Sequence, residues 1–132
     1  KLAATIERGL RSRHWKRFLK TVLGRNITDR VTADALQAFT RMRMLTESGG
    51  LDTRYKGVPE DAPGDLRPWY ELYQGQMGRV VFGHWAALGA REWSNCVSLD
   101  TGCVWGRALT GYELSSRQLI SCSVVESDLL TG

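Results

Sequence analysis

The sequence has no long apolar run and few cysteines, and both shortages exclude classes of protein. Its apolar runs are only a few residues long, as at 80–82, whereas a membrane-spanning helix needs about 18 or more apolar residues in a row. We therefore expect a soluble protein with no membrane partner. The cysteines, Cys96, Cys103 and Cys122, are odd in number and lack C-x-x-C spacing, so we expect reduced thiols in a cytoplasmic protein.

The chain also lacks a signal peptide and an initiator methionine. It begins at Lys1, so we expect a further portion of the protein upstream. Its 132 residues are enough for one domain with a single core. We see no repeat and no linker that would divide it.

Basic residues exceed acidic residues by 18 to 14, and the excess gathers near the beginning of the chain. The cluster comprises Arg8, Arg11, Arg13, Lys16, Arg17, Lys20, Arg25 and Arg30. Such a cluster suits a polyanionic partner, either a nucleotide or a nucleic acid. It equally suits the solvated face of an amphipathic helix, because several of these charges flank an apolar stripe.

Apolar spacing predicts three helices in the first third of the chain. The first covers residues 2–10, the second has Ser12 as its N-cap and stops near Gly24, and the third has Thr32 as its cap and runs to about residue 42.

Strands and turns are predicted after these helices. Residues 47–50 have the composition of a hairpin turn between two short strands, at 42–45 and from Leu51 onward. Residues 52–67 have the composition of an irregular excursion, and Pro68 suits the first turn of a short helix. Four strands are expected at 79–82, 96–99, 108–114 and 118–125. Helices followed by strands indicate an α+β fold with a mainly antiparallel or mixed sheet.

One histidine directly follows a predicted strand. Gly83 and His84 would place an imidazole at the strand's C-terminal end, where ligands gather in open α/β sheets. A neutral imidazole nitrogen is a good metal ligand. Taken alone, the pair also fits an ordinary surface or buried histidine.

Two further segments have phosphate-binding chemistry. The Asp100-Thr101-Gly102 sequence suits a tight turn, because aspartate bonds the following amides and glycine accepts a positive φ. That turn is either structural or places Asp100 beside a phosphate. Arg41 and Arg43 bracket a methionine, and guanidinium groups bind phosphate oxygens in pairs. Two solvated arginines at a helix end would have the same pattern.

Six blocks in order carry a resemblance to a known family. They are A-F-T-R-M-R (38–43), G-G-L-D (49–52), Y-K-G-V-P-E-D-A-P (55–63), L-R-P-W-Y (66–70), V-F-G-H-W-A-A-L-G (81–89) and L-D-T-G-C-V-W-G (99–106). In these blocks the chain resembles the C-terminal half of bacterial symmetrical bis(5'-nucleosyl)-tetraphosphatases, which belong to the calcineurin-like metallophosphatase superfamily. The match extends from Phe18 to about Leu114.

The resemblance implies a fold and an activity. Residues 1–132 would form the C-terminal portion of one metallophosphatase domain, a four-layer αββα sandwich. The enzyme would hydrolyse diadenosine tetraphosphate to two ADP with two divalent ions, Mn²⁺ or Co²⁺. By the same resemblance His84 is the family's last metal-ligand histidine, Arg41 and Arg43 are its arginine pair near the phosphates, and Asp100 is a looser match to a turn beside the site. No catalytic residue is assigned, and His14 matches no metal motif.

Other motifs of the family are missing here. Its remaining metal ligands lie in motifs such as Gly-Asp-x-His-Gly, Gly-Asn-His-Asp and His-Ala-Gly, none of which occurs in this sequence. Arg107 stands where the family usually has a second glycine. A two-ion centre needs about six protein ligands, so we expect the isolated chain to be inactive. With its sheet uncovered, we also expect it to be marginally stable or prone to aggregation.

Two other functions fit the residues. The chain would be a non-catalytic paralogue if it lost the other motifs, or a nucleic-acid-binding module if the basic helices of residues 7–30 contact phosphates. If the protein is a hydrolase, its partner is a dinucleoside polyphosphate substrate. Under that hypothesis, capped RNA ends are the one nucleic acid that we retain as a partner.

Overall fold

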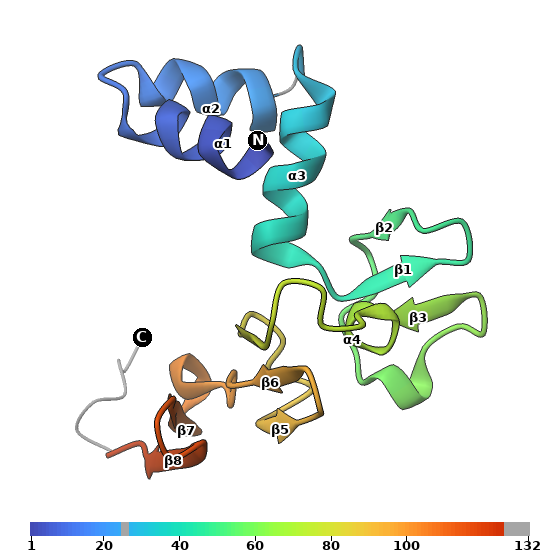
Figure 1. The fold of residues 1–132 in the computed structure, drawn as a ribbon, viewed down its shortest axis with the longest axis vertical. Coiled ribbons are helices and arrows are strands. Elements are labelled where there is room, and N and C mark those ends of the chain that lie inside the picture. Colours follow the sequence, from blue (N-terminus) through green and yellow to red (C-terminus); the bar gives the residue numbers. More distant parts are fainter. Residues whose placement is uncertain (25–26, 126–132) are drawn as a thin grey trace. The chain divides into compact units, whose positions relative to one another are not determined.

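The computed structural model describes residues 1–24 and 27–125, and the chain divides into two compact units (Figure 1). Residues 1–42 form the helical unit, and residues 43–132 form the sheet unit. Arg25, part of the predicted basic cluster, lies outside the described residues. Within the described ranges, no helix combines the length and the apolar character that crossing a bilayer requires. That the whole chain belongs to one metallophosphatase domain stays a prediction.

Three helices make up the helical unit, which confirms the prediction from apolar spacing. They are α1 (Leu2–Arg11), α2 (Trp15–Leu23) and α3 (Arg30–Arg41), and each helix contacts the other two. Their apolar stripes meet in a small core of Ile6, Val22, Ala33 and Leu36, with Phe18, Leu19, Ile27 and Ala35 packed against it.

The close approach of α1 and α2 depends on Gly9. A Cβ atom at Gly9 would lie 2.6 Å from ring carbons of Phe18, closer than packed carbon atoms allow. Glycine therefore permits the two helices to pack at this distance.

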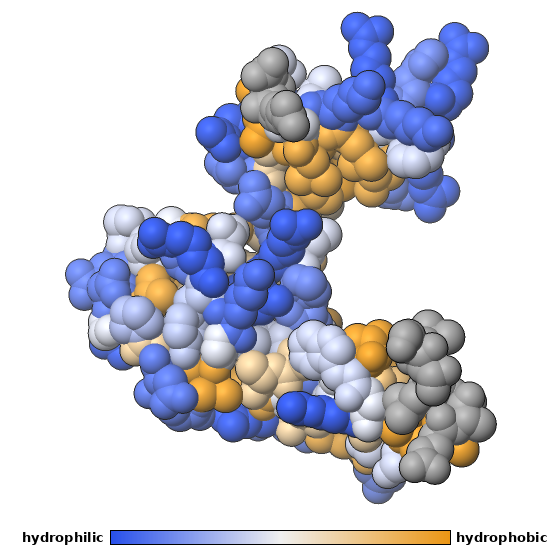
Figure 2. Space-filling view, turned by 180° about the vertical axis from the view of Figure 1, so that it is seen from behind, coloured by the Kyte–Doolittle hydropathy of each residue, from blue (hydrophilic) through white to orange (hydrophobic). Residues whose placement is uncertain are grey.

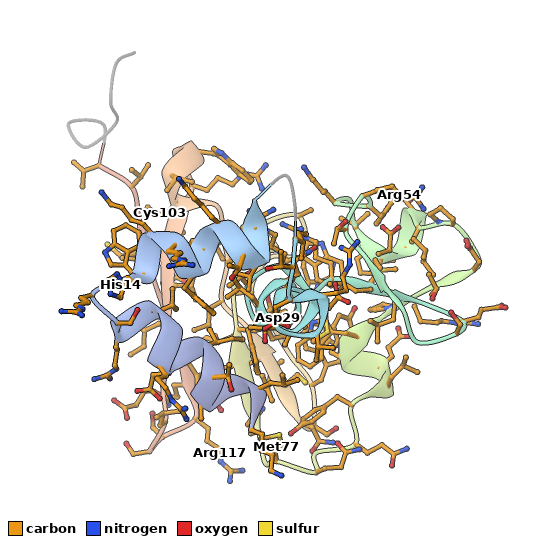
Figure 3. All side chains as sticks on the ribbon, turned by 90° about the horizontal axis from the view of Figure 1, so that it is seen from above. His14, Asp29, Arg54, Met77, Cys103 and Arg117 are labelled. Atoms are coloured by element: carbon orange, nitrogen blue, oxygen red, sulfur yellow. The ribbon has the colours of Figure 1, made fainter. Side chains whose placement is uncertain are left out.

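Two helix caps differ from those predicted. The hydroxyl of Ser12 does not cap α2; it accepts the N–H of His14 at 3.2 Å and donates to the carbonyl of Gly9 at 2.9 Å. Likewise α3 is capped by Asp29, whose carboxylate accepts the N–H of Thr32 at 3.0 Å. Thr32 is thus the third helical residue, whose N–H needs a cap, and not the cap itself. Figure 3 shows Asp29 at the start of α3 and His14 between α1 and α2.

The helical unit keeps hydrophobic atoms at its surface, bordered by hydrophilic side chains (Figure 2). A groove of about 440 Å³ runs along α1 and α3 and is lined mainly by apolar atoms, including those of Leu10 and Phe39. Phe39 is 67% exposed. The small core therefore leaves part of the apolar stripe of each helix in contact with solvent.

The sheet unit contains three small sheets. The first, in the order β2-β1-β3, is antiparallel and consists of β1 (Met44–Thr46), β2 (Leu51–Asp52) and β3 (Leu66–Pro68). The second, β4-β6-β5, consists of β4 (Val80–Phe82), β5 (Arg91–Glu92) and β6 (Cys96–Ser98), with β4 parallel and β5 antiparallel to β6. The third is the hairpin of β7 (Ala108–Glu113) and β8 (Gln118–Ser123). Short helices are α4 (Trp69–Leu72), η1 (Pro59–Asp61) and η2 (Cys103–Trp105).

These elements confirm a mixed α+β fold. Each of the four strands predicted after residue 79 is present, and the predicted turn at 47–50 connects β1 to β2. Two strands were not predicted. β3 lies at the end of the expected irregular excursion, and β5 has only two residues. Strands this short show no periodicity, and Pro68 is tolerated because β3 is at the edge of its sheet. The four-layer sandwich stays a prediction.

A cluster of aromatic rings packs beside β4. Tyr70 and Trp93 stack with ring centroids 4.2 Å apart, and Trp69 meets Phe82 edge to face at 4.9 Å. Trp85 joins the cluster and is 1% exposed. Burial of Tyr70 raises the pKa of its hydroxyl. Because such rings bury a large apolar area, the cluster holds the end of β4 in place.

Candidate functional site

His84 emerges from the end of β4 in an uncommon backbone conformation. β4 ends at Phe82, and the exposed His84 has a φ of 65°. The left-handed region is unfavourable for residues other than glycine, and such strain persists where surrounding contacts impose it. It is concentrated at functional sites in proteins.

Two contacts impose this conformation on His84. The Arg43 guanidinium donates from Nη2 to the His84 carbonyl oxygen at 2.7 Å. The next residue, Trp85, is buried and donates its indole N–H to the carbonyl of Gly57 at 2.9 Å. The histidine backbone is therefore held by segments that come from three of the six family blocks.

The Asp100 turn lies beside this strand end. The N–H of Leu99 donates to the carbonyl of Phe82 at 2.9 Å, which continues the pairing of β4 with β6. Asp100 Oδ1 accepts the N–H of Gly102 at 3.1 Å, and Gly102 has a φ of 73°. The turn therefore has the bonding and the positive φ that its residue types predicted.

A row of hydroxyl groups ties the Asp100 turn to the β7–β8 hairpin. Thr101 donates to the carbonyl of Ala108 at 2.5 Å and lies 3.0 Å from the hydroxyl of Thr110. Thr110 in turn lies 2.7 Å from the hydroxyl of Ser121, its partner in the strand register. Sequence reasoning missed this row, because only the register shows that Thr110 and Ser121 face each other.

A cleft of about 220 Å³ opens where these segments meet. Its lining includes His84, Asp100, Thr101, Cys103 and Leu109. Two of the predicted site residues, His84 and Asp100, thus share one cleft. A third predicted residue, Arg43, bonds the backbone of the first.

Arg41 and His14 belong to the helical unit. Arg41 is the last residue of α3 and is exposed. Its position relative to the cleft, and hence its role, stays a prediction. His14 is an exposed residue at the start of α2, as expected.

The carboxylate of Asp52 is engaged in local structure. It is 6% exposed and accepts the N–H of Tyr55 at 2.8 Å and the N–H of Arg54 at 3.0 Å. The bond from Tyr55 is the largest cause that lowers the pKa of Asp52. Asp52 therefore shapes the start of the excursion at residues 52–67.

The donors present do not complete a metal site. In the part of the chain that the structure describes, no three His, Cys, Asp or Glu side chains group as a metal ion would require. His84 is an accessible imidazole at a strand end and fits the role of a single ligand.

Comparison with known proteins identifies relatives of the chain. No protein-family model matches it. It is 37% identical over 131 residues to a protein named "Bis(5'-nucleosyl)-tetraphosphatase, symmetrical" from Chromobacterium violaceum, an alignment that covers 92% of this chain and 47% of that relative. Proteins of the same name from Burkholderia thailandensis and Burkholderia mallei are 38% identical over 124 residues, which cover 86% of this chain and 44% of each relative.

The chain therefore spans just under half the length of the curated relatives that it matches. The alignments cover about nine tenths of this chain, more than either compact unit alone contains. Over about nine tenths of its length, the chain is therefore a homologue of part of the symmetrical bis(5'-nucleosyl)-tetraphosphatases.

Proposed function

We propose that this chain is part of a hydrolase that cleaves diadenosine tetraphosphate symmetrically to two ADP. The observation that carries the proposal is the arrangement at the end of β4. There the Arg43 guanidinium holds the backbone of His84, and His84 shares a cleft with Asp100. The names of the relatives support the substrate class.

The residues of the chain have distinct roles in this proposal. Two divalent ions, Mn²⁺ or Co²⁺, supply Lewis acidity and activate water when bound. His84 contributes one imidazole ligand from its exposed position. Arg43 orients His84 and, together with Arg41, offsets phosphate charge. The Asp100 turn forms the adjoining wall of the phosphate site.

We also propose that the chain is inactive alone and acts in the cytoplasm. His84 is one ligand of about six that a two-ion centre needs, so the others would come from polypeptide corresponding to the rest of the relatives. The three free cysteines, Cys96, Cys103 and Cys122, suit a reducing compartment.

The test is a chimera that joins this chain to the part of the Chromobacterium violaceum relative that it does not match. Purified chimera is incubated with diadenosine tetraphosphate and Mn²⁺ or Co²⁺, and ADP is measured by chromatography. The relative itself is the positive control, and the 132-residue chain alone is expected to release no ADP.

Metal-dependent ADP release by the chimera supports the proposal. A chimera with the circular dichroism of a folded protein that releases no ADP contradicts it and favours a non-catalytic paralogue. Sequencing the DNA upstream of the codon for Lys1 then separates the two cases, because an in-frame Gly-Asp-x-His-Gly motif indicates an enzyme.

The nucleic-acid alternative has no specific support in the helical unit. Arg8, Arg11 and Arg17 are exposed, and Arg11 pairs with Glu7 at 3.0 Å across one helical turn. Such pairs are typical of solvated helix surfaces. Binding to nucleic acid that falls steeply with salt would reinstate this alternative.

A further inference from the structure

An exposed tryptophan lies next to the cleft. Trp105 is the last residue of η2 and is 70% exposed, and Cys103, at the other end of η2, lines the cleft. Three other tryptophans, Trp69, Trp85 and Trp93, are in the aromatic cluster. Within residues 1–24 and 27–125, Trp105 takes part in no ring stacking. Its π-face is therefore available to a ligand.

Two glycines set the backbone conformation around this indole. Gly102 and Gly106, on either side of η2, both have positive φ, 73° and 77°. A Cβ atom at Gly102 would lie 3.2 Å from Cε3 of Trp105 and 3.2 Å from Cδ of Arg107. The indole and the Arg107 side chain thus both pass over Gly102. A cationic side chain and an exposed aromatic ring therefore lie together in the segment between two residues that line the cleft, Cys103 and Ala108.

The size of the cleft determines where a nucleobase can lie. The cleft is about 220 Å³, smaller than the roughly 300–1,000 Å³ of pockets that enclose small-molecule ligands. A phosphate group fits in this volume, but a nucleoside attached to it must extend over the rim. The exposed indole of Trp105, in the segment between the lining residues Cys103 and Ala108, offers the flat apolar surface on which any base stacks.

We infer that Trp105 is a nucleobase-stacking residue. It stacks against an adenine whose phosphates occupy the cleft of His84 and Asp100, and Arg107 places positive charge beside the same nucleotide. The identity of the nucleotide as part of diadenosine tetraphosphate rests on the proposed function. The stacking itself requires only a nucleotide.

The binding test uses the purified chimera and nuclear magnetic resonance. The Trp105→Phe variant identifies the indole N–H signal of Trp105, and the chimera is titrated with ADP and, separately, with ribose 5-phosphate. We expect ADP to shift the Trp105 signal and ribose 5-phosphate, which has no base, to leave it in place. No shift with ADP, or equal shifts with both compounds, would overturn the inference.

The kinetic test uses the chimera and compares two substrates. Trp105→Ala should raise KM for diadenosine tetraphosphate roughly 5- to 100-fold, the range expected for loss of one stacked base. Hydrolysis of inorganic tripolyphosphate, which carries no aromatic ring, should be affected far less, and Trp105→Phe should retain most of the affinity for diadenosine tetraphosphate. Equal losses on both substrates would assign the ring to structure and contradict the inference.

The two tests separate this inference from the proposed function. If the chimera releases ADP and Trp105→Ala has the same KM as the parent, stacking is wrong and the hydrolase proposal stands. If the chimera is inactive while ADP shifts the Trp105 signal, the hydrolase proposal is wrong and the stacking stands.

Discussion

The contacts that stabilise the helical unit internally differ in kind from those that stabilise the sheet unit internally. Three short helices of the helical unit pack their apolar stripes into a core of four buried residues. The sheet unit depends instead on bonds between distant residues, such as the one from Trp85 to Gly57 and the one from Arg43 to His84. Local sequence therefore accounts for the helical unit, whereas the site in the sheet unit forms only when residues distant in the sequence come into contact.

The largest expected effect compares the two histidines. In the chimera, His84→Ala should lower kcat for diadenosine tetraphosphate by at least about 100-fold, because even neighbours of metal ligands cost 10- to 100-fold when replaced. The matched variant His14→Ala, in the helical unit, should leave the rate unchanged. Metal content, measured by mass spectrometry, should fall only for His84→Ala. Equal rates and metal content in both variants would remove His84 from the site.

The second comparison uses two tryptophans. Trp85 is 1% exposed in the sheet unit, and Trp15 is 44% exposed in the helical unit. Trp85→Ala should lower the free energy of unfolding by about 3–5 kcal/mol, as expected for truncating a buried large ring. Trp85→Phe should cost less, because a phenyl ring still fills part of the buried space, although the rest of the indole and its bond to Gly57 are lost. Urea denaturation measures each change, and a Trp15→Ala effect as large as that of Trp85→Ala would contradict this assignment.

The third comparison separates the two arginines. Arg43→Ala removes a charged hydrogen bond to the His84 carbonyl, and kcat/KM of the chimera should fall roughly 10- to 100-fold, since such bonds contribute about 1.5–3 kcal/mol. Arg43→Lys should recover only part of the loss, because lysine lacks the planar fork of arginine. Arg41→Ala should have a smaller effect. If Arg41→Ala lowered kcat/KM more than Arg43→Ala, Arg41 and not Arg43 would be the more important arginine of the site.

The fourth comparison concerns glycines. Gly9→Ala places a methyl group 2.6 Å from the Phe18 ring, whereas a Cβ at Gly64 meets nothing within 4 Å. Overpacking of this kind costs about 1–3 kcal/mol, so Gly9→Ala should lower the thermal midpoint of the helical unit. Gly64→Ala should leave it nearly unchanged. Circular dichroism at 222 nm follows the helices during heating, and similar midpoints for the two variants would show that α1 and α2 can separate at low cost.

The smallest expected effect is at the cap of α3. Hydrogen bonds from Thr32, its side chain first and its backbone N–H second, hold the pKa of Asp29 below its ordinary value. A lowered pKa in the folded state means that the bond stabilises the helix above that ordinary value and is lost as the pH falls through the folded pKa. Asp29→Asn should therefore flatten the loss of stability below about pH 4. Asp34→Asn, at an exposed position in the same helix, should not.

Prediction from sequence succeeded where structure depends on near neighbours. The three helices and four of the strands after residue 79, namely β4, β6, β7 and β8, follow from apolar spacing, and the turn of Asp100 and Gly102 follows from residue type. Errors occurred at two helix N-termini, where a residue suited by type to be the N-cap either bonds other groups or lies near a second suitable residue. Ser12 and Thr32 are good caps by residue type, but the hydroxyl of Ser12 bonds other groups and Asp29 lies three residues before Thr32.

Residue types and their spacing were enough to indicate the α+β class, the Gly83-His84 strand end and the family. These properties follow from segments of a few residues each and from the order of the six blocks. The left-handed backbone of His84, its bond from Arg43 and the exposure of Trp105 required the folded chain. Each of these features depends on contacts between segments that are distant in the sequence. The free energy of such contacts comes from many residues far apart in the chain, so no short segment of the sequence reveals it.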